Sequence, residues 1–175
     1  MRKVQVSPYN EQWPFMFAEE VKRIEEILGK DIIRSHHIGS TSVPGLKAKP
    51  IIDILIVVRD IALVDTFNQE MSTIGYLSKG ESGIPGRRYF QKGGDDRTHH
   101  VHVYQKGNDE IDRHLAFRDY LREHPYAREE YGNLKERLAL EFPYDVAAYI
   151  DGKDRFVKTL EAKAVEWYKQ RDVER

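Results

Sequence analysis

Three side chains that could bind a metal ion or transfer a proton lie in two strand-like segments. Asp53 is the only acid in the apolar run of residues 51–58. His100 and His102 alternate with valines, so both imidazoles project from one face of a strand, whereas His99 points to the other face and is expected at the surface. A carboxylate and two imidazoles could bind Mn, Fe, Ni or Zn. Alternatively, His102 could be a general acid or base, or both histidines could be structural, bonded to Asp53 or to the backbone.

A possible anion-binding turn precedes this acid. Gly39, Ser40 and Thr41 follow a strand-like run. A glycine allows a close backbone turn, and the following amides and hydroxyls can face a phosphate, with help from a helix dipole if a helix begins there. An ordinary turn and helix cap is the alternative interpretation.

Several cations occupy positions where apolar residues are expected. Arg118 lies inside one helical apolar arc, Lys153 lies inside another, and Lys135 lies at the edge of a third. A desolvated cation is costly unless it is paired, so these residues indicate a cleft that receives negative charge. Lys49, which precedes Asp53, could join them. The alternatives are that their stems lie along the surface, or that they pair with acids.

These residues must be positioned by a sheet and by helices. Periodicity and punctuation by Gly and Pro predict strands at residues 32–38, 51–58, 87–91 and 99–104, and helices at 10–28, 61–74, 109–123, 125–142 and 145–169. The expected class is α+β, or α/β with a mixed sheet. We expect one domain over residues 1–175, with a sheet part (1–106) and a C-terminal helical part (107–175). Arg87 and Arg88 open one strand, so only one of them can face the site.

Composition excludes several classes of protein. The formal net charge of -1 and the absence of a basic stripe make nucleic acid an unlikely partner. There is no cysteine, which excludes disulfides and thiolate metal sites. No apolar run approaches membrane-spanning length and no apolar leader is visible, so we expect a cytoplasmic protein without a membrane partner. The sequence does not predict an oligomeric state.

The spacing of the turn and the acid resembles that of polymerase-β-type nucleotidyltransferases. These enzymes place a Gly-Ser or Gly-Gly turn ahead of a strand that begins with Asp, a hydrophobic residue and a second acid, and their carboxylates hold divalent metals. Here Leu55 occupies the position of the second acid. One carboxylate cannot hold two Mg²⁺ ions.

A closer resemblance covers nearly the whole chain. HIGSTSVPGLKAKPIIDI (residues 37–54), Trp13-Pro14, the His100–Val103 segment and HLAFRDYLREHP (residues 114–125) resemble the signature of the GrpB family. That resemblance implies a polymerase-β-like nucleotidyltransferase fold, with a mixed sheet, flanking helices and a C-terminal helical segment. It also favours Lys49 over Lys47 as a site residue.

Three functional hypotheses follow. In the first, the protein binds a small phosphorylated ligand, a nucleotide, with a divalent metal (Mg or Mn, or a transition metal) and transfers a nucleotidyl or phosphoryl group to an acceptor. Asp53, His100 and His102 would be the catalytic and metal-binding residues. Gly39, Ser40, Thr41, Lys49, Arg118 and Lys153 would bind phosphate. The second is a non-catalytic nucleotide- or anion-binding module, which Leu55 favours. The third is a metal-dependent phosphohydrolase.

Overall fold

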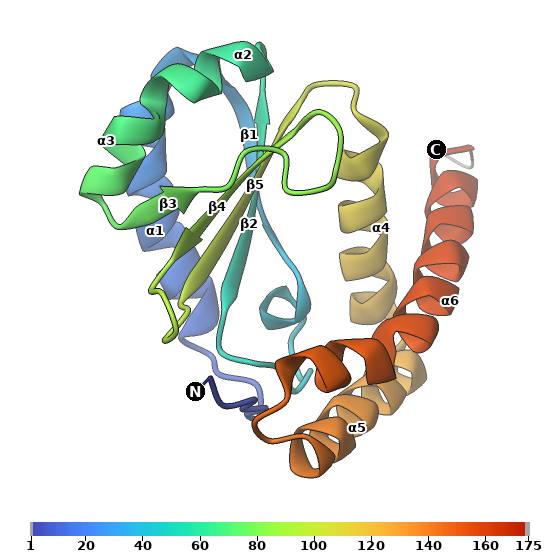
Figure 1. The fold of residues 1–175 in the computed structure, drawn as a ribbon. Helices are drawn as coiled ribbons and strands as arrows, with labels where there is room; N and C mark the ends of the chain where they lie inside the picture. Colours follow the sequence, from blue (N-terminus) through green and yellow to red (C-terminus); the bar gives the residue numbers. More distant parts are fainter. Residues whose placement is uncertain (1, 174–175) are drawn as a thin grey trace. The chain divides into compact units, whose positions relative to one another are not determined.

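The sheet of the protein has five strands in a mixed arrangement (Figure 1). The computed structural model describes residues 2–173. The strands are β1 (Ile32–Ile38), β2 (Ile52–Val58), β3 (Tyr76–Ser78), β4 (Arg87–Lys92) and β5 (His99–Gln105), in the order β1-β2-β5-β4-β3. β2 and β5 are parallel, and the other neighbours are antiparallel. The predicted mixed sheet is confirmed, and β3, a short strand, is an addition to it.

Three helices belong to the sheet part of the chain: α1 (Trp13–Leu28), α2 (Ile61–Val64) and α3 (Asn68–Thr73). Single 3₁₀ turns follow α1 at Gly29–Asp31 and separate α2 from α3 at Asp65–Phe67. The prediction of one continuous helix over residues 61–74 is therefore wrong, because a 3₁₀ turn divides it into two short helices. The Thr66 hydroxyl donates to the Leu63 carbonyl oxygen at 2.6 Å, a local side-chain bond of the kind that competes with regular helix bonding.

One face of the sheet is packed against α1. Ile24 is fully buried, and the Phe17 ring stacks on the His37 imidazole of β1 with 4.9 Å between centroids. The Glu20 carboxylate accepts hydrogen bonds from the Tyr76 hydroxyl and the Lys92 ammonium, both at 2.8 Å. His99 lies beside it, with Nε2 3.9 Å from a Glu20 oxygen. The expectation that His99 lies at the surface is wrong, because α1 covers this face with a carboxylate that complements it.

The chain forms two compact units. One consists of Glu11–Ile38 and Ile51–Ile111 and contains the sheet. The other consists of Met1–Asn10, Gly39–Pro50 and Asp112–Arg175 and is mainly helical. Each unit is therefore assembled from segments that are distant in sequence.

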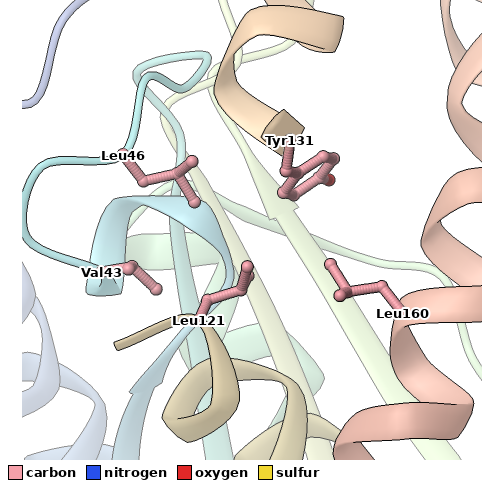
Figure 2. Close-up of a cluster of buried hydrophobic side chains, with 5 residues drawn as sticks. All are labelled: Val43, Leu46, Leu121, Tyr131 and Leu160. Carbon is pink, nitrogen blue, oxygen red and sulfur yellow. The ribbon is translucent and has the colours of Figure 1, made fainter. Parts of the chain in front are cut away.

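The helical unit is built on α4 (Asp109–Glu123), α5 (Pro125–Glu141) and α6 (Val146–Val173). Pro125 occupies the first turn of α5, where its missing N–H removes no helical hydrogen bond. A core cluster joins the helices to the loop after β1, as Figure 2 shows; it consists of Val43, Leu46, Leu121, Tyr131 and Leu160. The N-terminal segment adds to this unit through an antiparallel bridge between Ser7 and Ala48.

Among the residues that the structure describes, no helix is both long enough and apolar enough to cross a lipid bilayer.

Candidate functional site

Strand pairing places the acid and both histidines on one face of the sheet. In the parallel pair, Asp53 of β2 lies opposite His100 of β5, and Leu55 lies opposite His102. Alternation puts all four side chains on the same face, opposite to the one that α1 covers. Tyr89 of β4 pairs with His102 and projects to this face as well. Residues about fifty positions apart in sequence therefore form one cluster.

Both imidazoles contact the same oxygen of Asp53. His100 Nδ1 lies 3.2 Å from Asp53 Oδ1, and His102 Nε2 lies 3.3 Å from it. The other ring nitrogens face arginines: Arg97 Nη1 is 3.2 Å from His100 Nε2, and Arg87 Nη1 is 3.4 Å from His102 Nδ1. A guanidinium only donates hydrogen bonds, so each of these nitrogens must carry the lone pair. The N–H groups of both histidines therefore point to Asp53.

The arginines are themselves held in place. Arg87 is buried and donates to the backbone oxygens of Glu81 and Ser82 at 3.1 and 2.8 Å. Arg88 faces the other way and forms a bidentate pair with Asp65. The prediction that these two arginines face opposite sides of the sheet is confirmed. The Tyr89 ring lies 5.6 Å from the His100 ring and 5.2 Å from the His102 ring, which restricts both imidazoles.

The environment keeps Asp53 ionised. Burial raises the pKa of its carboxyl, but the hydrogen bonds from His100 and His102 lower it more, so this pKa lies well below its usual range. The side chain is 25% exposed, so the carboxylate can still be reached from solvent. Asp53 is thus a fixed negative charge and a weak base.

The donor set does not fit a two-metal centre. Leu55, at the position of the second acid, is fully buried, and it offers no ligand. Within residues 2–173, no group of three or more His, Asp or Glu side chains is arranged to hold a metal ion. His100 and His102 also direct protons, rather than lone pairs, toward Asp53. Asp53 alone fits a different role, since Mg²⁺ is commonly held by one or two carboxylates together with substrate phosphates.

The turn at Gly39–Thr41 lies in the helical unit, and its role in binding phosphate stays a prediction. Gly39 adopts φ 73° and ψ −176°, a conformation that essentially only glycine tolerates. It is followed by a 3₁₀ turn, η2 (Ser40–Ser42), in which the Ser42 amide donates to the Gly39 carbonyl oxygen at 3.1 Å. Gly39 and Ser40 are half-buried, whereas Thr41 is buried. Arg122 donates twice to the Ser42 carbonyl oxygen and holds the turn.

The three predicted phosphate-binding cations differ in their surroundings. Arg118 pairs with its neighbour Asp119, with 2.8 Å between Nε and Oδ1, so a carboxylate already offsets its charge. Lys49 and Lys153 instead approach the same aromatic ring. Their ammonium groups lie 4.8 and 5.4 Å from the centroid of Tyr149. The structure thus brings Lys49 and Lys153 together, and their role in binding phosphate stays a prediction.

A third lysine of this cluster was not among the predicted site residues. Lys135 of α5 is only 2% exposed, and its ammonium lies 4.5 Å from the Tyr131 ring centroid. Its position at the edge of the helical stripe was visible in the sequence. Its depth was not, because burial depends on how α5 packs against segments from elsewhere in the chain.

Comparison with known proteins agrees with the resemblance found in the sequence. The family model described as "GrpB protein" matches residues 3–163. The "UPF0157 protein YqkA" of Bacillus subtilis is 54% identical over 171 residues, which are 98% of this chain and 50% of that protein. The chain therefore spans about half the length of this relative.

Solved structures agree with the fold. The crystal structure of the conserved protein GrpB from Enterococcus faecalis matches with a TM-score of 0.91 and 47% identity, covering 94% of this chain and 99% of that one. Cid1 poly(U) polymerase with MgGTP bound matches with a TM-score of 0.52 and 12% identity, covering 77% of this chain and 44% of that one. At this identity the second likeness shows the fold alone, which is that of the nucleotidyltransferases.

Proposed function

The chain belongs to the GrpB family and has a nucleotidyltransferase-like fold, and we propose on this basis that it binds a nucleotide as its complex with one divalent metal ion. The ion arrives with the phosphates and is held by Asp53. The observation that carries the proposal is the single ionised carboxylate at the start of β2, oriented by two imidazole N–H groups. A nucleotidyltransferase-like fold with MgGTP bound in Cid1 supports the choice of ligand.

Each residue of the cluster has a defined part in this proposal. His100 and His102 occupy Oδ1 of Asp53, which leaves the second carboxylate oxygen for the metal ion. Arg87 and Arg97 keep the imidazole lone pairs away from that ion. Bound magnesium or manganese would neutralise phosphate charge. Because the chain has no second carboxylate at Leu55, we do not expect it to bind free metal ions tightly.

Calorimetry tests the proposal. Mg²⁺ or Mn²⁺ alone is expected to give no saturable heat, whereas a nucleoside triphosphate with the metal is expected to bind. Asp53→Asn should weaken this binding about ten- to hundredfold, since a charge-assisted contact is lost. Asp95→Asn, which removes an exposed acid from the β4–β5 turn, is the matched control. Equal binding by Asp53→Asn and the wild type, or no binding across the common nucleotides, would refute the proposal.

The proposed nucleotide binding could occur with or without transfer of a nucleotidyl or phosphoryl group, and these are two candidate functions. Leu55 favours binding without transfer, because this residue replaces a metal-binding acid by a fully buried hydrocarbon. Incubation with a metal–nucleotide complex, followed by chromatography, separates the two functions: an unchanged nucleotide with every acceptor offered supports the binding module. Release of phosphate that requires a transition metal and disappears in His102→Ala would indicate a phosphohydrolase instead.

A further inference from the structure

Two buried polar groups of the helical unit lack hydrogen-bond partners among the described residues. They are the ammonium nitrogen of Lys135 and the hydroxyl of Tyr149. The two side chains are 2% and 0% exposed. An unsatisfied polar group costs free energy when it is buried, and a charged one costs more. Such a group requires an explanation, and a bound ion that supplies the missing partner is one such explanation.

The surroundings of Lys135 are positive. Burial lowers the pKa of its ammonium group, and the nearby charges of Lys153 and Lys49 lower it further, well below its usual range. Lys49 and Lys153 are half-buried and lie over the ring of Tyr149. The ring of Tyr131 covers one side of the Lys135 ammonium group. A ring face attracts a cation, but it leaves the other N–H donors of the group unsatisfied.

Three chain segments bring these groups together. Lys49 comes from the loop before β2, Lys135 from α5, and Tyr149 and Lys153 from the first turns of α6. Tyr149 packs with Val4 and Leu138, and Tyr131 belongs to the core cluster of Figure 2. Both rings are therefore held in place by packing. We propose that Lys49, Lys135, Lys153 and the Tyr149 hydroxyl form a binding site for a phosphate-type oxyanion.

A tetrahedral oxyanion could satisfy both the hydrogen-bond donors and the positive charges of this site. It offers several acceptor oxygens and a negative charge, which would satisfy the Lys135 and Tyr149 donors and offset the repulsion among the three ammonium groups. The site lies within one compact unit and does not depend on Asp53. Only the identity of the anion as a phosphate group, rather than another oxyanion, rests on the proposed function.

Inorganic phosphate and pyrophosphate are the probes for the test. Thermal unfolding of the whole chain is followed while each probe is added at constant ionic strength, with sulfate and acetate as comparison anions. Phosphate and pyrophosphate are expected to raise the midpoint, and acetate is not. Lys135→Met should weaken the binding about ten- to hundredfold, and Lys153→Met should do so in part. Lys158→Met, which removes an exposed charge from the same helix, should respond as the wild type does.

The outcomes separate this site from the one at Asp53. An absent phosphate response in the wild type, or an undiminished one in both Lys135→Met and Lys153→Met, would overturn the anion site. A phosphate response lost in Asp53→Asn would also overturn it, because the response would then belong to the other site. A retained response in a protein that binds no nucleotide would refute the proposed function alone.

Discussion

Replacing Lys135 by methionine should stabilise the protein in the absence of phosphate. Methionine has a similar length and no polar donor, so the substitution removes an unsatisfied buried amine and keeps the packing. Burying a polar group without a hydrogen bond costs about 1–3 kcal/mol by mutational measures. The free energy of unfolding should rise by that amount. For a chain of this size the midpoint of thermal unfolding should then rise by about 2–12 °C.

The effect should depend on pH in a defined direction. Burial and the charges of Lys153 and Lys49 hold the pKa of Lys135 below its usual range, so the unfolded chain binds the proton more tightly than the folded chain does. Wild-type stability should therefore rise with pH from neutral toward the unfolded value of about 10.4. In Lys135→Met this part of the slope should be absent, and the stability gain should be smaller at pH 9.5 than at pH 7.

Urea unfolding in a phosphate-free chloride buffer, at both pH values, measures the difference. Lys158→Met is the control and should change the free energy of unfolding by less than about 0.5 kcal/mol, because its side chain is exposed. If Lys135→Met is less stable than the wild type at both pH values, then the ammonium group has a satisfying partner within the chain. The reasoning that leads to an anion site would then be refuted.

Three further predictions concern the protonation of Lys135 on anion binding, Glu20 and Gly39. Pyrophosphate binding should take up protons, because Lys135 must be charged to bind the anion. Titration calorimetry at pH 8, in buffers of different ionisation enthalpy, should therefore give binding heats that differ between buffers. Equal heats in all buffers would contradict this prediction. Glu20→Gln should lower the free energy of unfolding by about 2 kcal/mol, because Glu20 is buried against Lys92. Burial raises the pKa of Glu20, but hydrogen bonds from Lys92 and the Tyr76 hydroxyl lower it more. In urea unfolding the wild-type advantage should therefore begin to fall below the unfolded pKa of about 4.3 and be lost as the pH drops through the lowered folded pKa. Gly39→Ala should cost about 1–3 kcal/mol, because its positive φ strains any side chain, and an unchanged melting midpoint by circular dichroism would contradict that strain.

Much of the sheet could be predicted from local patterns. The run around Asp53 and the alternation around His100 and His102 indicate strands by themselves, and the structure confirms them as β2 and β5. Alternation also assigns both histidines to one face. That this face carries Asp53 as well depends on the parallel pairing of β2 with β5 and on its register, which no local pattern encodes.

The burial and pairing of single polar side chains were harder to predict. Arg118 lies inside an apolar arc, as Lys153 does, yet it is neutralised by the adjacent Asp119. His99 has the same local sequence signal as an exposed histidine, yet it is buried beside Glu20 of α1. Lys135 lies only at the edge of an apolar stripe in the sequence, yet its side chain is buried in the helical unit. The burial of His99 and Lys135 depends on how distant segments pack against them, which helical or strand periodicity cannot specify.

Consecutive residues of β5 enter two separate polar clusters, one on each side of the sheet. His99 lies beside Glu20, and His100 donates to Asp53. A shift of β5 by one residue would exchange the faces of its side chains. The Asp53 face would then carry His99, Val101 and Val103, so at most one imidazole could reach Asp53 in place of the two that contact it in the native pairing. The hydrogen bonding at Asp53 therefore disfavours pairing of β5 that is shifted by one residue, and an intact Asp53 cluster is evidence that β5 pairs with β2 in the native register.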